Sequence, residues 1–81
     1  MKVYIFVTLD GDSDVVVGAF DSKRKAKDKL IEWVIDRYST YNRTDTLEYQ
    51  DFIKAIIETM KTDNEYLYGE TLCKIFTKKV E

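Results

Sequence analysis

The chain has no histidine, no proline, a single cysteine and only three glycines among its 81 residues. Without histidine, the commonest general base and metal ligand is missing, and neither a Ser–His nor a Cys–His nucleophile pair can form. The glycines are too scattered to build a phosphate-binding loop. A carboxylate pair could transfer protons, but the acidic residues fall in predicted turns and on helix faces, where solvation is the rule. We therefore expect no enzymatic activity and no cofactor.

Cysteine, long apolar runs and excess charge are also scarce. Cys73 is alone, so no intramolecular disulfide can form, and its apolar neighbours predict a small buried side chain. Asp10 ends the N-terminal apolar segment before it reaches signal-peptide length, and no run approaches the length of a membrane span. These features predict a cytoplasmic protein with no membrane association.

The composition is that of one small globular domain. The chain is 44% hydrophobic and 14% aromatic, which is enough for a core in a single domain over residues 1–81. The net charge of −2 excludes a strongly basic nucleic-acid binder. Acidic residues outnumber basic ones over residues 41–70, which is a weak sign of a basic partner surface beside the simpler reading of a solvated helix.

Two β-rich runs, residues 2–9 and 15–20, flank the turn-forming segment Asp-Gly-Asp-Ser-Asp and predict a hairpin. With all five turn residues in the loop, Ile5 faces Ala19. One face of the pair is then aliphatic, and the other is aromatic. The aliphatic face holds Val3, Ile5, Val7, Leu9, Val15, Val17 and Ala19; the aromatic face holds Tyr4, Phe6, Thr8, Val16, Gly18 and Phe20.

Two helices are predicted next. Asp21 or Ser22 caps a helix that runs to about Ser39 and is apolar over more than half its circumference, which predicts contact with two elements. Asp45, with Glu48 three residues later, predicts the cap of a second helix that ends near residues 63–64. Residues 66–68 and 71–80 read as strands, and the lysines of the last one suggest a protected edge.

The predicted fold is an α+β domain, ββααβ or ββααββ. An antiparallel sheet of three or four strands, with the first strand central, carries two helices on one face. We expect the helices to cover the aliphatic face, because its side chains are smaller. The aromatic face would then be partly bare.

The aromatic face is the principal candidate site. Tyr4, Phe6 and Phe20 would form a protein-binding or dimerisation patch, unless the last strands cover them as ordinary core; base stacking is a third reading, without its usual motifs. Arg37 either packs its stem and exposes its head at the helix C-terminus or anchors a partner.

A basic collar surrounds the start of the first predicted helix and carries the alternative site. An anion or a nucleic-acid backbone could bind there; solvation with local pairs such as Arg24–Asp28 and Lys29–Glu32 is the simpler reading. The collar residues proposed for anion binding are Lys23, Arg24, Lys25 and Lys27.

Asp10, Asp12 and Asp14, with Asp21 at the twelfth position, resemble the start of a calcium-binding loop. Val15 stands where that loop requires glycine, and the residues after it favour a strand. A charged hairpin turn is the preferred interpretation, and no metal site is assigned.

The residues Lys2-Val3-Tyr4-Ile5-Phe6-Val7, followed after the turn by Val17-Gly18-Ala19-Phe20-Asp21-Ser22-Lys23 and Lys25-Ala26, resemble the opening of small bacteriophage proteins, in which a hairpin leads into a capped helix. The resemblance covers about the first 35 residues. It implies a protein that binds a host or defence protein, and it assigns no functional residue.

The sequence as a whole favours a non-catalytic protein-binding domain, an inhibitor or modulator of a host protein acting in the host cytoplasm. A homodimer formed through the same sheet face is a further hypothesis. The alternative function is a nucleic-acid-binding accessory protein that uses the basic collar.

Overall fold

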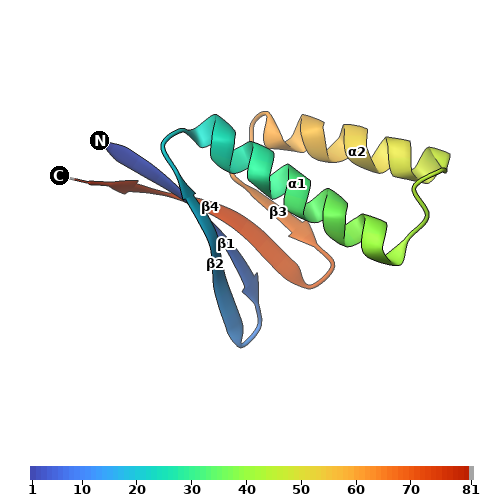
Figure 1. Cartoon of the computed structure of the whole chain (residues 1–81), viewed down its shortest axis with the longest axis horizontal. Helices are drawn as coiled ribbons and strands as arrows, with labels where there is room; N and C mark the ends of the chain where they lie inside the picture. Colours follow the sequence, from blue (N-terminus) through green and yellow to red (C-terminus); the bar gives the residue numbers. More distant parts are fainter. Residues whose placement is uncertain (81) are drawn as a thin grey trace.

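In the computed structural model, which describes residues 1–80, the chain forms six elements in the order ββααββ (Figure 1). These are β1 (Lys2–Asp10), β2 (Ser13–Phe20), α1 (Lys23–Tyr41), α2 (Leu47–Met60), β3 (Glu65–Tyr68) and β4 (Thr71–Lys79). The four strands make one antiparallel sheet in the order β2-β1-β4-β3, against which the helices pack. The predicted α+β class is confirmed, in its larger form ββααββ.

The last strand is central, and the prediction that it forms a protected edge is wrong. β4 lies between β1 and β3 and pairs with β1 from Lys2↔Lys79 to Leu9↔Leu72. The lysines of β4 therefore do not protect an edge strand from pairing with another chain. Lys74 and Lys78, four residues apart, stand on one face of the sheet instead. The edges are β2 and the four-residue β3.

The turn of the first hairpin is shorter than expected. Asp10 pairs with Ser13, which leaves a two-residue turn with Gly11 at φ +59°, a conformation that favours glycine. The register then shifts by one residue between Phe6 and Val7, where β2 carries a bulge. Ile5 faces Ala19 as predicted.

Nearer the turn, the predicted faces of β2 are wrong. Thr8 pairs with Val15 and Val7 pairs with Val16, so these two valines exchange the faces expected from a five-residue loop. Because side chains alternate along a strand, the bulge is what restores the predicted faces beyond it.

Helix α1 begins where the sequence predicts and contacts two layers. The Ser22 hydroxyl accepts a hydrogen bond from the backbone N–H of Lys25 at 3.2 Å, which satisfies one of the free donors of the first turn. Ala26, Leu30 and Val34 are buried against the sheet, and α1 also packs on α2. The wide apolar arc predicted for this helix serves those two contacts.

Helix α2 is capped by Thr46, which corrects the prediction of Asp45. The Thr46 hydroxyl accepts from the backbone N–H of Tyr49 at 3.1 Å. Asp45 instead forms an ion pair with Arg43, with 2.7 Å between the guanidinium and the carboxylate. The helix ends at Met60, without a left-handed Asn cap, since no non-glycine residue among those described has positive φ. It packs on α1 and β3.

The helices cover the aromatic face of the sheet, and the expectation that they cover the aliphatic face is wrong. Phe6 is fully buried, and Thr8 is 7% exposed. The pairs Thr8↔Cys73 and Phe6↔Ile75 place two buried β4 residues on the same face. The edge of the Trp33 ring meets Phe6, with the ring centroids 6.2 Å apart. The core therefore lies between this face and the two helices.

Phe6 and Phe76 offer a direct test of which face is covered, because they lie on adjacent strands and opposite faces. Phe6→Ala leaves a cavity in the core and is expected to lower the free energy of unfolding by about 3–5 kcal/mol. Phe76 is 41% exposed, so Phe76→Ala should cost well under that amount. Urea denaturation of both variants measures the difference. Equal losses would contradict this assignment of the faces.

Candidate functional site

The sheet face opposite the helices is largely apolar, and neither helix covers it. The register places alternate residues of all four strands on this surface, which we call the open sheet face. Its apolar members are Val3, Ile5, Val7, Leu9, Val16, Ala19, Leu67, Leu72 and Phe76, and its charged members are Asp14, Glu65, Lys74 and Lys78.

Exposure on the open sheet face increases from the middle outward. Val7, on central β1, is 9% exposed, because neighbouring side chains of the same face surround it. Leu67 on β3 and Val16 on β2 are 63% and 66% exposed. Single exposed apolar residues are ordinary, but a continuous set over four strands is typical of a binding surface.

The charges on this face are few and mixed. The Lys74 ammonium lies 5.1 Å from the centre of the Phe76 ring, within range of a cation–π contact. Lys78, which pairs with Val3, lies on the other side of Phe76 along the same face of β4. The two lysines therefore flank the exposed Phe76 ring along β4, with Glu65 of β3 opposite Lys74 on the same face.

The aromatic residues predicted as the docking patch belong to the core side of the sheet. Phe6 is fully buried, and Tyr4 and Phe20 pack against the same cluster. The Phe20 ring also covers Gly18, where an added Cβ would lie 2.9 Å from the ring. These rings are thus unavailable as an exposed patch. An uncovered sheet face does exist, but it is the aliphatic one.

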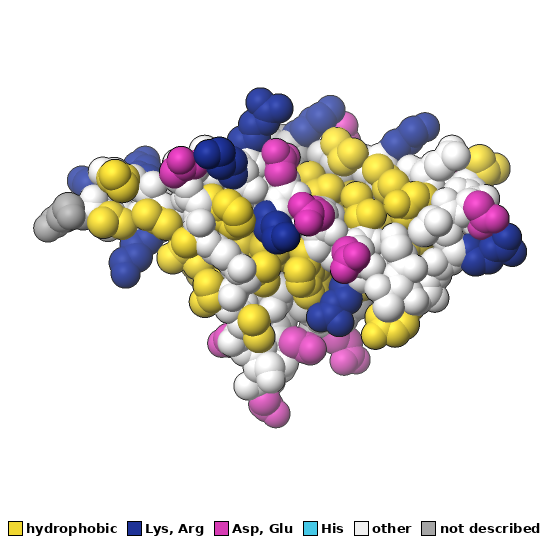
Figure 2. Space-filling view, in the orientation of Figure 1, with side chains coloured by type: hydrophobic (Ala, Val, Ile, Leu, Met, Phe, Trp, Pro, Cys, Tyr) yellow, Lys and Arg dark blue, Asp and Glu magenta, His cyan; other side chains and the backbone are white. Residues whose placement is uncertain are grey.

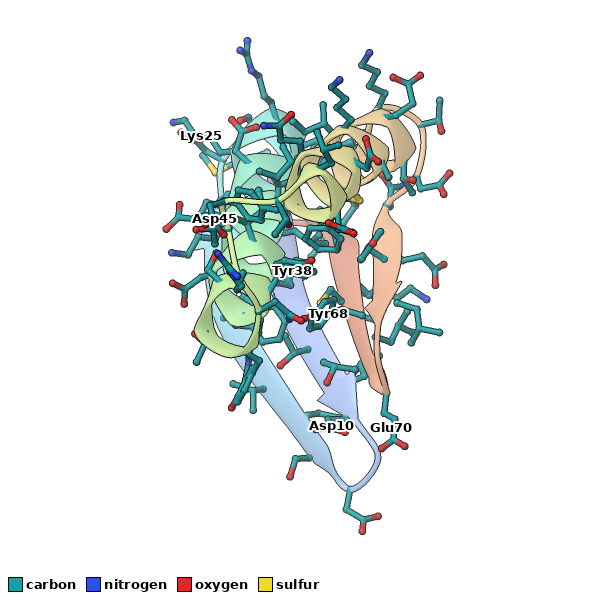
Figure 3. The ribbon with its side chains drawn as sticks, turned by 90° about the vertical axis from the view of Figure 1, so that its right-hand side faces the viewer. Asp10, Lys25, Tyr38, Asp45, Tyr68 and Glu70 are labelled. Carbon is teal, nitrogen blue, oxygen red and sulfur yellow. The ribbon has the colours of Figure 1, made fainter. Side chains whose placement is uncertain are left out.

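Arg37 lies apart from both sheet faces. It is exposed, and its guanidinium carbon is 4.7 Å from the centre of the Trp33 ring. It lines a hollow of about 320 Å³ together with Tyr41, Tyr68 and Glu70. In Figure 3, Tyr38 and Tyr68 project into the space between α1 and β3, and Glu70 and Asp10 mark the ends of the two hairpins. Arg37 is exposed, as one of the two readings predicts, but it is the guanidinium head rather than the stem that stacks on Trp33.

The structure divides the basic collar. Lys23, Arg24 and Lys27 line one cleft between α1 and α2. Lys25 instead binds Asp21 at 2.9 Å and holds the pKa of that carboxyl below its usual value. The predicted pair Lys29–Glu32 is present at 3.2 Å, whereas Arg24–Asp28 is not among the ion pairs of residues 1–80. The basic collar is therefore split between the cleft, which Lys23, Arg24 and Lys27 line, and a separate ion pair of Lys25 with Asp21.

The aspartates of the first turn do not converge. The two-residue turn sets Asp14 opposite Leu9, on the open sheet face, while Asp10 pairs with Ser13. Across residues 1–80, no three His, Cys, Asp or Glu side chains gather as a metal site would require. Within the same part of the chain, no helix combines the length and apolar character needed to cross a membrane.

Comparisons with known proteins give no relative: no family model matches the chain, and neither curated proteins nor solved structures show a significant match.

The sequence alone did not identify the β4 residues of the open sheet face, above all Lys74 and Phe76. The signal was the alternation of Leu72, Lys74, Phe76 and Lys78 along one side of β4, where two lysines mark a solvent-facing side. Which β1 residues share that side could be known only from the pairing of β4 with β1.

Cys73 and Tyr66 are the groups whose titration the fold perturbs toward the neutral form. Burial raises the pKa of the Cys73 thiol to about 11 and raises the pKa of Tyr66 above its usual value. A buried thiol that remains protonated is a poor nucleophile, so Cys73 functions as a packing residue.

These two raised pKa values predict a loss of stability at alkaline pH. An acid with a higher pKa in the folded state binds more protons when folded, so its stabilising contribution is complete below the ordinary thiol pKa of 9.0 and is lost as the pH rises toward 11. Urea midpoints should therefore fall over this range, and the fall should be shallower in Cys73→Ala, where only Tyr66 contributes. Equal slopes in the two proteins would contradict the assignment to Cys73.

Proposed function

We propose that this protein is a non-catalytic protein-binding domain that docks through the open sheet face. The observation that carries the proposal is the continuous apolar surface on the uncovered side of the sheet, with Val16, Leu67 and Phe76 each more than 40% exposed. A soluble monomer rarely leaves such a surface without a partner. Phenylalanine, present here as the exposed Phe76, is enriched at protein interfaces.

The chemistry of the face defines the partner. Its apolar side chains would contact aliphatic or aromatic residues, and the exposed Lys78 near the end of β4 would meet a carboxylate. An apolar segment with flanking acidic residues fits both requirements. A helix with one such face could lie across the strands, because the open sheet face is broad and shallow.

Strand β2 offers a second means of attachment beside the open sheet face. It is an eight-residue edge strand without proline or lysine, so one of its sides presents free backbone donors and acceptors. The bulge at Val17 interrupts this edge only once. A partner strand added at β2 would extend the apolar surface and strengthen the same contact.

The resemblance of residues 2–26 to small bacteriophage proteins supports a more specific form of the proposal. In this form the domain captures a bacterial host or defence protein in the cytoplasm and blocks or redirects it. The open sheet face is the surface expected to make that capture.

Charge placed on the open sheet face should abolish partner binding without unfolding the domain. We expect Leu67→Glu with Phe76→Glu to lose a protein that the unmodified domain retains from a bacterial lysate, because both positions would bury a carboxylate in an apolar contact. The matched control is Tyr41→Glu with Leu47→Glu, at exposed apolar positions on the helices, outside that face and away from β2. Retained proteins are identified by mass spectrometry, and folding is checked by urea denaturation.

A retained protein lost equally from both double variants would contradict docking through the open sheet face. Sedimentation of the purified domain distinguishes a second outcome. A dimer dissociated by the open-face substitutions alone would show that the face joins two copies of this chain rather than a different protein.

A further inference from the structure

A cleft of about 540 Å³ lies between the start of α1 and the end of α2, on the outer side of the helical layer. Figure 2 shows Lys and Arg side chains gathered in this region, with hydrophobic side chains beside them. The lining comes from the two helices and Lys61, just beyond α2, and shares no residue with the open sheet face. Its volume is in the range of small-molecule sites, which often lie between helices.

The rim of the cleft is strongly cationic for a protein with a net charge of −2. It carries four cations, Lys23, Arg24, Lys27 and Lys61, against the single carboxylate of Asp28. The Glu58 carboxylate lies 3.0 Å from the Lys61 ammonium and partly offsets its charge. Within residues 1–80, Lys23, Arg24 and Lys27 therefore form no ion pair.

The position of these cations on the helix adds to the field. The first turn of α1 has no acidic residue, so nothing within it offsets the partial positive charge of the helix N-terminus. Lys23 and Arg24 therefore raise the local potential where it is already positive, an arrangement that costs stability in the free protein and is relieved by a bound anion, whereas Lys61 caps the C-terminus of α2, where a cation is favoured.

The floor of the cleft is aliphatic. Ile31 on α1 and Ile57 and Met60 on α2 line it, and Ile57 is 43% exposed although it lies on the apolar side of its helix. The α1–α2 contact thus stops short of covering Ile57. A polyanion such as a nucleic-acid backbone would use the rim and leave this floor exposed to water, whereas an alkyl group would cover it.

We propose that this cleft, which we call the interhelical cleft, binds a small anionic amphiphile: a molecule with one phosphate or carboxylate headgroup and a short alkyl body. The headgroup contacts Arg24 and Lys27, with Lys23 and Lys61 at the sides, and Arg24 supplies the forked donor geometry that oxyanions favour. The alkyl body lies on Ile31, Ile57 and Met60. This site is independent of protein docking on the open sheet face.

Decyl phosphate, used as a monomer in solution, is the probe, and its dissociation constant is measured by isothermal titration calorimetry. Decanol and inorganic phosphate test the two halves of the site. Decyl phosphate should bind at least about tenfold more tightly than either, because each lacks one set of contacts. Equal binding of inorganic phosphate, or of decanol, would overturn the proposal.

Matched variants localise the binding. Arg24→Gln with Lys27→Gln removes two cations from the cleft and should weaken decyl phosphate by about tenfold or more. Lys25→Gln with Lys29→Gln removes two cations from the same helix outside the cleft and should change the affinity by no more than about twofold. Ile57→Ser, at an exposed position, should weaken decyl phosphate and leave inorganic phosphate unaffected.

Two further results would overturn the proposal. One is equal weakening by both charge-removing pairs, which would indicate a general effect of net charge. The other is salt-sensitive binding of a DNA duplex, lost in the Arg24–Lys27 variant, by a protein that does not bind decyl phosphate; the cationic rim would then serve a nucleic-acid backbone. Chemical-shift changes at Ile31, Ile57 and Met60 on addition of decyl phosphate would support the proposal independently.

Discussion

Two helices cannot cover both faces of a four-stranded sheet, and the rest of this structure follows from that limit. Both helices lie on the same side of the sheet (Figure 1), so the fold has a single helical layer. Yet β1 is apolar on both of its faces, from Val3 to Leu9. Whichever face the helices choose, the other must meet either water or a partner. An unsatisfied apolar surface is therefore built into the topology.

The helices cover the aromatic face because that choice buries more surface. Phenylalanine and tyrosine each remove much more apolar area from water than valine does. The helices also contribute aromatic rings to this side of the sheet: the edge of Trp33 contacts Phe6, and Tyr38 stacks on Phe52 with ring centroids 4.4 Å apart. On the other face, Lys74 and Lys78 would have had to be buried beneath helices, at a high desolvation cost.

The sequence predicts the elements far better than it predicts their pairing. The spacing of apolar residues identifies both helices and both strands of the first hairpin, because this signal is local. The cap predicted for α1 includes Ser22, which the structure confirms, whereas α2 is capped by Thr46 rather than Asp45. The Asp-rich turn could be two or five residues long, and only tertiary pairing selects Gly11-Asp12 and adds a compensating bulge. The place of β4 beside β1 joins residues some 70 positions apart, which no local pattern encodes. The candidate site shifted to the other face for that reason.

Because both helices lie on one face of the sheet, the open sheet face and the interhelical cleft are separate surfaces. The open sheet face consists of strand residues, while the interhelical cleft is lined by residues of α1, α2 and Lys61, so the whole core lies between them. The contact of Trp33 with Phe6 links α1 to central β1, one residue from Val7 on the open face. Packed side chains of this kind transmit a shift only if they have two stable arrangements. Since the two surfaces share no residue, both can be occupied at once.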